Sequence, residues 1–194
     1  FCNYHQLQEY DWSIRIDDDS FFTKAINFDF FEVLDTNNCH FGSGYTKTEV
    51  YPNERDCRQQ LHHFTKSFCT KYKIVPKSEI LKKYLHEDND DYLMGPQKKK
   101  KESTPLIWNC GNCNVYNMEM FKTDSWKKWN QAFNDLGGGY LYRWGDIEVM
   151  GLYAYIFLEK PLYDFRLIEQ KLYETGNTSW LRVGTAPGTV DGQH

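Results

Sequence analysis

A strand-like segment that ends in three consecutive aspartates constrains the fold of this chain more than any other feature. Residues 10–16 (Tyr-Asp-Trp-Ser-Ile-Arg-Ile) partly alternate and are rich in β-forming residues, so we predict a strand there. Asp17, Asp18 and Asp19 follow directly. Three adjacent carboxylates cannot continue a buried strand, because unpaired charges are costly to remove from water. The triplet therefore marks the end of that strand.

The rest of the chain alternates between helical and extended patterns. Helices are predicted over residues 28–34, 53–72, 120–136 and 146–157, and further strands over 39–45 and 107–115. Strands that alternate with helices predict an α/β layered fold. Residues 77–104 are charged and polar, with a run of lysines over 98–101, and are expected to form a surface excursion. The tail from residue 175 onward is expected to be irregular.

Composition and charge exclude several classes of protein. The 194 residues are 40% hydrophobic and 26% charged, which is typical of a globular domain. A net charge of −4 argues against a general nucleic-acid binder. No apolar run approaches the roughly 18 residues that a membrane-spanning helix needs. Cys110 and Cys113 form a C-x-x-C pair, for which buried or disulfide-bonded cysteines are favoured over a zinc or redox site.

The aspartate triplet predicts a divalent-cation site. Alternate residues of an extended segment share a face, so Asp17 and Asp19 point the same way. Carboxylate oxygens are the ligands that Mg²⁺ and Mn²⁺ prefer, usually together with a substrate diphosphate. An ordinary acidic turn is the alternative. Such a turn needs neither the apolar strand before the triplet nor Phe21 and Phe22 after it.

A second unusual stretch, Gly-Gly-Gly-Tyr-Leu-Tyr-Arg-Trp-Gly-Asp, occupies residues 137–146. Its glycines permit close backbone approach, and Tyr142 and Trp144 are suited to stacking on sugar or base faces. Arg143 could pair with Asp146 or with the aspartate triplet. Asp146 opens a predicted helix, where it could accept hydrogen bonds from a sugar hydroxyl or act as a base. The alternative is that Asp146 is only the N-cap of that helix.

These segments together resemble the fungal α-1,2-mannosyltransferases of glycosyltransferase family 15. Residues 1–4 and 10–19 are similar to the family's Met-Cys-Arg-Phe and Tyr-Trp-Arg-Val-Glu-Pro-Asp segments. Residues 37–42 are similar to its Asn-Asn-Lys-x-Tyr-Gly, and residues 137–146 to its Gly-Gly-Phe-Phe-Tyr-Glu-Arg-Trp-Gly-Asp. The resemblance implies a single GT-A-type, Rossmann-like α/β domain. We expect the domain to be incomplete at its N-terminus, because family members have substantial sequence before the acidic motif.

The resemblance also implies metal-dependent, retaining transfer of mannose from GDP-mannose to a mannosyl acceptor, a glycan or glycoprotein, in the Golgi lumen. Asp17 and Asp19 are the implied ligands of Mn²⁺ or Mg²⁺, and Asp146 is the implied acceptor-side residue and candidate base. Nucleic acid is not expected as a partner, and membrane contact is expected only through a segment absent from this chain. The implied substrate-binding residues are Arg143, Trp144, Tyr142, Asp18 and Asn112.

The match leaves two questions about the site open. A candidate nucleophile of the family is the Glu of its Ser-Asn-Phe-Glu, whose place is taken here by Asn114. An amide cannot form a covalent glycosyl intermediate, so either transfer follows a front-face route with Asn114 stabilising charge, or the alignment is shifted. The family's metal-binding His has no counterpart near residues 172–174, where Glu169 or Glu174 could substitute. A catalytically inactive glycan-binding or scaffold domain is therefore the alternative function, and a metal-dependent nuclease or phosphatase a distant third.

Overall fold

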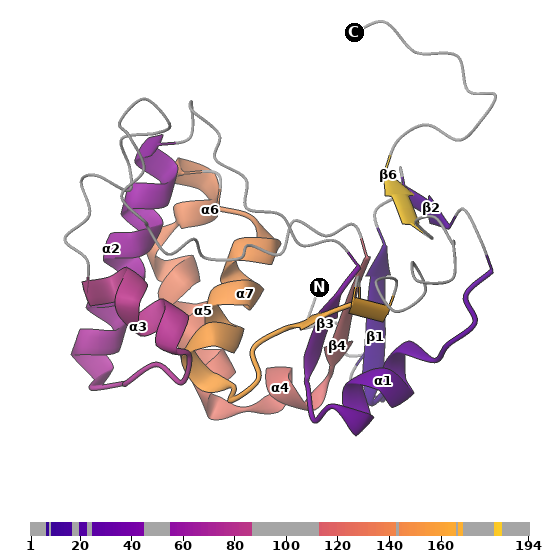
Figure 1. Cartoon of the computed structure of the whole chain (residues 1–194). Helices are drawn as coiled ribbons and strands as arrows, with labels where there is room; N and C mark the ends of the chain where they lie inside the picture. The colour runs from indigo at the N-terminus through magenta and orange to yellow at the C-terminus, as the bar shows by residue number, and fades with distance from the viewer. Residues whose placement is uncertain are drawn as a thin grey trace, which may run out of the picture.

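The fold is a mixed sheet with helices on both sides, seen in a computed structural model of the chain (Figure 1). Figure 1 shows α2, α3, α5, α6 and α7 gathered on one side of the sheet, with α1 on the other. The residues that the structure describes are 7, 9–16, 20–22, 25–44, 55–86, 113–142, 144–165, 167–168 and 181–183.

The main sheet has four strands and contains both antiparallel and parallel pairs. In spatial order they are β1 (Trp12–Ile16), β4 (Cys113–Asn117), β3 (Phe41–Ser43) and β5 (Tyr163–Asp164). β4 is antiparallel to both β1 and β3, whereas β5 is parallel to β3. The predicted strands over residues 10–16 and 39–45 are confirmed as β1 and β3. The strand predicted over 107–115 is confirmed where it overlaps β4, and residues 107–112 lie outside the described part.

A second, two-stranded sheet corrects the expectation of an irregular tail. β2 (Ser20–Phe22) pairs antiparallel with β6 (Leu181–Val183). Leu-Arg-Val is a short β-forming run, but its pairing partner lies at the other end of the chain. The remaining tail residues, 169–180 and 184–194, lie outside the described residues.

Seven helices lie within the described residues, and three of the four predicted helices are confirmed to within two residues at each end. They are α1 (Phe30–Thr36), α2 (Arg55–Tyr72), α3 (Glu79–His86), α4 (Glu119–Lys122), α5 (Asp124–Leu136), α6 (Gly138–Leu141) and α7 (Asp146–Phe157). The prediction of one continuous helix over 120–136 is wrong. Thr123 has an extended backbone (φ −70°, ψ 150°) that ends α4, and its Oγ1 accepts a hydrogen bond from the Trp126 amide at 3.1 Å to cap α5.

The predicted surface excursion over 77–104 is wrong for its first part, which forms α3. Leu81, Tyr84 and Leu85 are buried, and their spacing of three and four residues puts them on one face of this helix. Lys82 and Lys83 lie between them in sequence, so the composition of the segment concealed its apolar face. Residues 87–104 lie outside the described residues.

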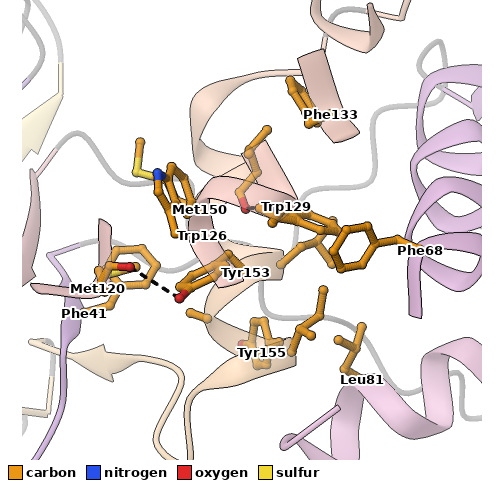
Figure 2. Close-up of a cluster of buried hydrophobic side chains, with 14 of the residues drawn as sticks. Phe41, Phe68, Leu81, Met120, Trp126, Trp129, Phe133, Met150, Tyr153 and Tyr155 are labelled. Carbon is orange, nitrogen blue, oxygen red and sulfur yellow. Dashed lines mark hydrogen bonds between the residues drawn. The ribbon is translucent and has the colours of Figure 1, made fainter. Parts of the chain in front are cut away.

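The larger core fills the space between the sheet and the helical layer (Figure 2). Trp129 is fully buried at its centre, packs edge-on against Phe68 at 4.9 Å, and donates from Nε1 to the carbonyl oxygen of Val149 at 3.0 Å. α7 passes through this core, and its residues 149–156 are all buried. That explains why α7 is apolar around its whole circumference. No helix in the described ranges is long and apolar enough to cross a membrane.

A smaller core lies between the sheet and α1. Phe30 and Leu34 of α1 pack there with Val115 and Cys113 of β4 and with Phe165. Successive residues of a strand point to opposite faces, so Asn114 and Tyr116 of β4 face the helical layer instead. Tyr116 belongs to the larger core, as this alternation requires.

Candidate functional site

An ion pair joins β1 to the start of α7. Arg15 Nε lies 3.3 Å from Asp146 Oδ2, with side chains that are 24% and 45% exposed. Arg15 is the penultimate residue of β1, and Asp146 is the first residue of α7. The pair therefore brings together the two segments that sequence analysis selected, the strand before the aspartate triplet and the stretch over residues 137–146.

Sequence analysis gave Asp146 and the aspartate triplet as the two alternative partners of Arg143. Arg143 lies outside the described residues, and the partner that the structure gives Asp146 is Arg15. Arg15 was not selected from the sequence. One available signal was an arginine inside a predicted core strand directly before three carboxylates, where a buried cation needs a counter-ion.

A row of polar side chains crosses all four strands at the level of Arg15. Arg15 is directly opposite Asn114, Asn114 is opposite Ser43, and Ser43 lies beside Asp164. Residues at matching positions of neighbouring strands share a face of the sheet, so this polar row faces the helical layer. Asn114 and Ser43 are fully buried. The candidate residue Asn114 is thus an interior side chain of the sheet, next to Arg15.

The α7 N-terminus is built by residues on both sides of Asp146. Gly145 has an extended backbone and is the N-cap, so the alternative that Asp146 is the N-cap is wrong. The Gly145 amide donates to Glu148 Oε2 at 3.0 Å, which satisfies one of the free N–H groups at this end of the helix. Asp146 lies in the first turn, where the positive end of the helix dipole favours a carboxylate.

Trp144 is buried in the larger core rather than presented at the surface. Its side chain is 6% exposed, and its ring lies 5.4 Å from the rings of both Phe64 and Phe133. The backbone of Gly138 lies against the Trp144 ring, so a Cβ atom placed on Gly138 would lie 2.0 Å from Trp144 Cε3. Tyr142 is half-buried and packs against Trp144 at 5.4 Å. The Trp144 ring therefore anchors the segment that leads to Asp146.

The predicted metal ligands Asp17 and Asp19, with Asp18 and Asn112, lie outside the described residues. Asp17 directly follows the last residue of β1, and Asn112 directly precedes the first residue of β4. Those two strand ends, Ile16 and Cys113, are paired, so both predictions adjoin the same end of the sheet. No group of three or more His, Cys, Asp or Glu residues that could hold a metal ion occurs in the described ranges.

Three cysteines in the described part are free and buried, whereas sequence analysis left buried and disulfide-bonded cysteines open as the favoured alternatives. They are Cys39, Cys69 and Cys113. Burial raises the pKa of the Cys113 thiol to about 11, so the thiol stays protonated at neutral pH. A redox role requires an accessible thiolate, which Cys113 does not provide. Its partner in the C-x-x-C pair, Cys110, lies outside the described residues.

Comparison with known proteins identifies relatives for almost the whole chain. Residues 1–175 match the sequence pattern of a family described as glycolipid 2-alpha-mannosyltransferase. The chain is 28% identical, over 160 residues, to the probable mannosyltransferase KTR3 of Saccharomyces cerevisiae; the match covers 82% of this chain and 36% of that protein.

Two solved structures share the fold. The mannosyltransferase Ktr4p of S. cerevisiae in complex with GDP matches with a TM-score of 0.65 and 20% identity, over 98% of this chain and 46% of that chain. Core-mannan synthase A of Aspergillus fumigatus, in its Mn/GDP form, matches with a TM-score of 0.60 and 18% identity, over 86% of this chain and 43% of that chain. The expected GT-A-type α/β fold is thereby confirmed. The chain spans less than half the length of each of these three relatives.

Proposed function

The chain belongs to the glycolipid 2-alpha-mannosyltransferase family, and from this we propose that it is the catalytic part of a metal-dependent, retaining mannosyltransferase. It would transfer mannose from GDP-mannose to a mannosyl acceptor in glycoprotein glycosylation in the Golgi lumen. The observation that carries the proposal is the ion pair between Arg15 and Asp146. This pair joins, in three dimensions, two of the sequence segments on which the family resemblance rests.

The donor side of the proposed site is the end of β1. Asp17 and Asp19 would hold the metal ion, with Asp18 and Asn112 contacting the donor. Carboxylates suit a hard divalent cation such as Mn²⁺, so the donor set fits the metal named in the relative's Mn/GDP form. When bound, such a cation neutralises the negative charge that develops on a departing diphosphate.

The acceptor side of the proposed site is the start of α7. The Asp146 carboxylate is nearly half exposed, and we assign it the role of accepting the proton of the acceptor hydroxyl. Arg143 and Tyr142 would contact the sugars from the preceding segment. Trp144, whose ring is packed inside the protein, would act by fixing the backbone of this segment.

Asn114 is the weakest candidate for direct contact with the sugar. Its side chain is fully buried in β4, and an amide is not a nucleophile. We therefore propose a front-face route to retention, in which Asn114 stabilises charge from within the polar row.

The burial of Asn114 also favours a second candidate function, a glycan-binding or scaffold domain without transfer activity. A buried amide at the place of a catalytic carboxylate is the expected mark of a site that retains binding and has lost chemistry. The two candidates differ in one outcome, since only the first predicts turnover.

Calorimetry with GDP-mannose, with and without Mn²⁺, tests the proposed function on the longest soluble form of the protein. We expect binding that requires Mn²⁺ and is weaker for UDP-sugars. Asp19→Ala should weaken binding by about tenfold or more. The matched control is Asp124→Ala, which removes a carboxylate that is 98% exposed on α5, and it should bind like the wild type.

A transfer assay with GDP-mannose and a mannoside acceptor then separates the two candidates. Formation of an α-linked product supports the mannosyltransferase, whereas Mn²⁺-dependent binding without product supports the binding domain. Absence of donor binding by a folded protein, with or without Mn²⁺, would contradict the mannosyltransferase and favour the glycan-binding or scaffold domain.

A further inference from the structure

Arg15 connects two rigid parts of the proposed site. On the sheet side, β1 pairs with β4 along its whole length, and this pairing puts Arg15 opposite the fully buried Asn114. The next position in the polar row, Ser43, is also fully buried. The backbone and stem of Arg15 are therefore fixed by the sheet.

On the helix side, the start of α7 fixes the backbone of Asp146. Trp144 is locked in the core, and Gly145 is held by Glu148, so the α7 start has a defined position. The Asp146 side chain leaves this support and is 45% exposed. The ion pair with Arg15 is a contact that orients this carboxylate.

We propose that Arg15 is a positioning residue for the acceptor side: it holds the Asp146 carboxylate in the orientation that receives the acceptor hydroxyl. This inference rests on the proposed function, because it assigns Arg15 a role through Asp146. Arg15 lies on β1, the strand that leads into the donor side, but by this inference it serves the acceptor side.

The geometry separates a positioning role from a stabilising one. A partly exposed ion pair with a separation of 3.3 Å contributes little to folding, since such pairs are screened by water. Loss of Arg15 should therefore leave the protein folded. A misplaced catalytic group, by contrast, lowers turnover steeply even for displacements of about 1 Å.

The test compares Arg15→Gln and Arg15→Lys with Asp146→Asn and the double variant Arg15→Gln/Asp146→Asn. The control is Lys122→Gln, which removes the more exposed ion pair between Lys122 and Glu119, on α4 beyond the opposite end of β4. Urea unfolding measures stability, calorimetry measures donor binding, and initial rates measure kcat and KM for the acceptor.

We expect Arg15→Gln and Lys122→Gln to unfold at the same urea concentration as the wild type, and donor affinity to be unchanged within about twofold. Arg15→Gln should lower kcat for transfer to the acceptor by about 10-fold to 100-fold, and Arg15→Lys should retain part of the activity that Arg15→Gln loses. When Asp146 is already Asn, removing Arg15 should add less than about twofold, because the two residues act as one unit.

Three results would overturn the proposal: an unchanged kcat in Arg15→Gln, losses that multiply in the double variant, or a loss confined to donor binding. If the wild type shows no transfer, the proposed function fails instead. Positioning is then judged by NMR of the ¹³C-labelled Asp146 carboxyl, which needs no turnover. A shifted signal in Arg15→Gln supports the contact, and an unshifted one refutes it.

Discussion

Adding a single methyl group at Gly138 tests whether the Trp144 ring is locked in the way the structure describes. Gly138 is buried at the start of α6, and a Cβ atom on it would lie 2.0 Å from Trp144 Cε3 and 2.3 Å from Cζ3. Real Cβ atoms do not approach a ring this closely, so Gly138→Ala must move the indole or the α6 backbone. Gly151 in α7 offers a matched control, because its added Cβ would meet no atom within 4 Å.

Gly138→Ala should lower the free energy of unfolding because the Trp144 ring has little room to move. Trp144 is 6% exposed and packs against Phe64 and Phe133, so the indole cannot turn away without displacing them. Overpacking of this kind costs about 1–3 kcal/mol. Gly→Ala within a helix otherwise gains about 0.5–1 kcal/mol, and Gly151→Ala should show that gain alone.

Thermal unfolding followed by circular dichroism measures the difference. One kcal/mol corresponds to about 2–4 °C in Tm for a chain of this size. We expect Gly138→Ala to lower Tm by up to about 10 °C and Gly151→Ala to raise it by about 1–4 °C. If Gly138→Ala is as stable as Gly151→Ala, the ring is not packed on α6 and the anchoring role of Trp144 is refuted.

Two further predictions concern a helix-capping hydroxyl and a buried thiol. Thr123→Val removes the hydroxyl that caps α5 and lies 2.8 Å from the Tyr153 hydroxyl. Urea unfolding should therefore show that the free energy of unfolding falls by about 1 kcal/mol. The control is Thr70→Val, at an exposed position of α2, which should change the free energy of unfolding little. Cys113 should react with a thiol reagent at pH 8 only after unfolding, since burial raises its pKa from 9.0 to about 11. A raised pKa means that the folded state holds the proton more tightly, so Cys113 contributes stability at neutral pH that is lost as pH rises from about 9 to about 11. Rapid labelling of Cys113 in the native protein would contradict its burial in β4.

The elements that could be predicted from the sequence are those whose pattern is local. α7 was predicted with its observed bounds, because a glycine precedes it and its residues 149–156 are all buried. α3 was missed because alternation of leucines with lysines resembles a charged loop until the helical spacing is considered. The break at Thr123 was missed because one capping hydroxyl, not a glycine or a proline, divides α4 from α5.

The candidate site depended on information that no local pattern contains. The sequence predicted that Asp146 matters, but its partner Arg15 is brought to it by the order of strands in the sheet and the packing of α7. The polar row likewise follows from the register of β4 with β1 and β3. Asn114, Ser43 and Asp164 have no spacing in the sequence that would group them.

The stretch over residues 137–146 combines a residue that packs in the core with a residue of the proposed site. Trp144 points into the core against Gly138, while Asp146, two residues later, points outward to Arg15. Gly145 between them takes the extended conformation that starts α7. Substitutions in this stretch should therefore divide into two classes. Those at Gly138 or Trp144 should lower stability first, and those at Asp146 should lower transfer while the protein remains folded.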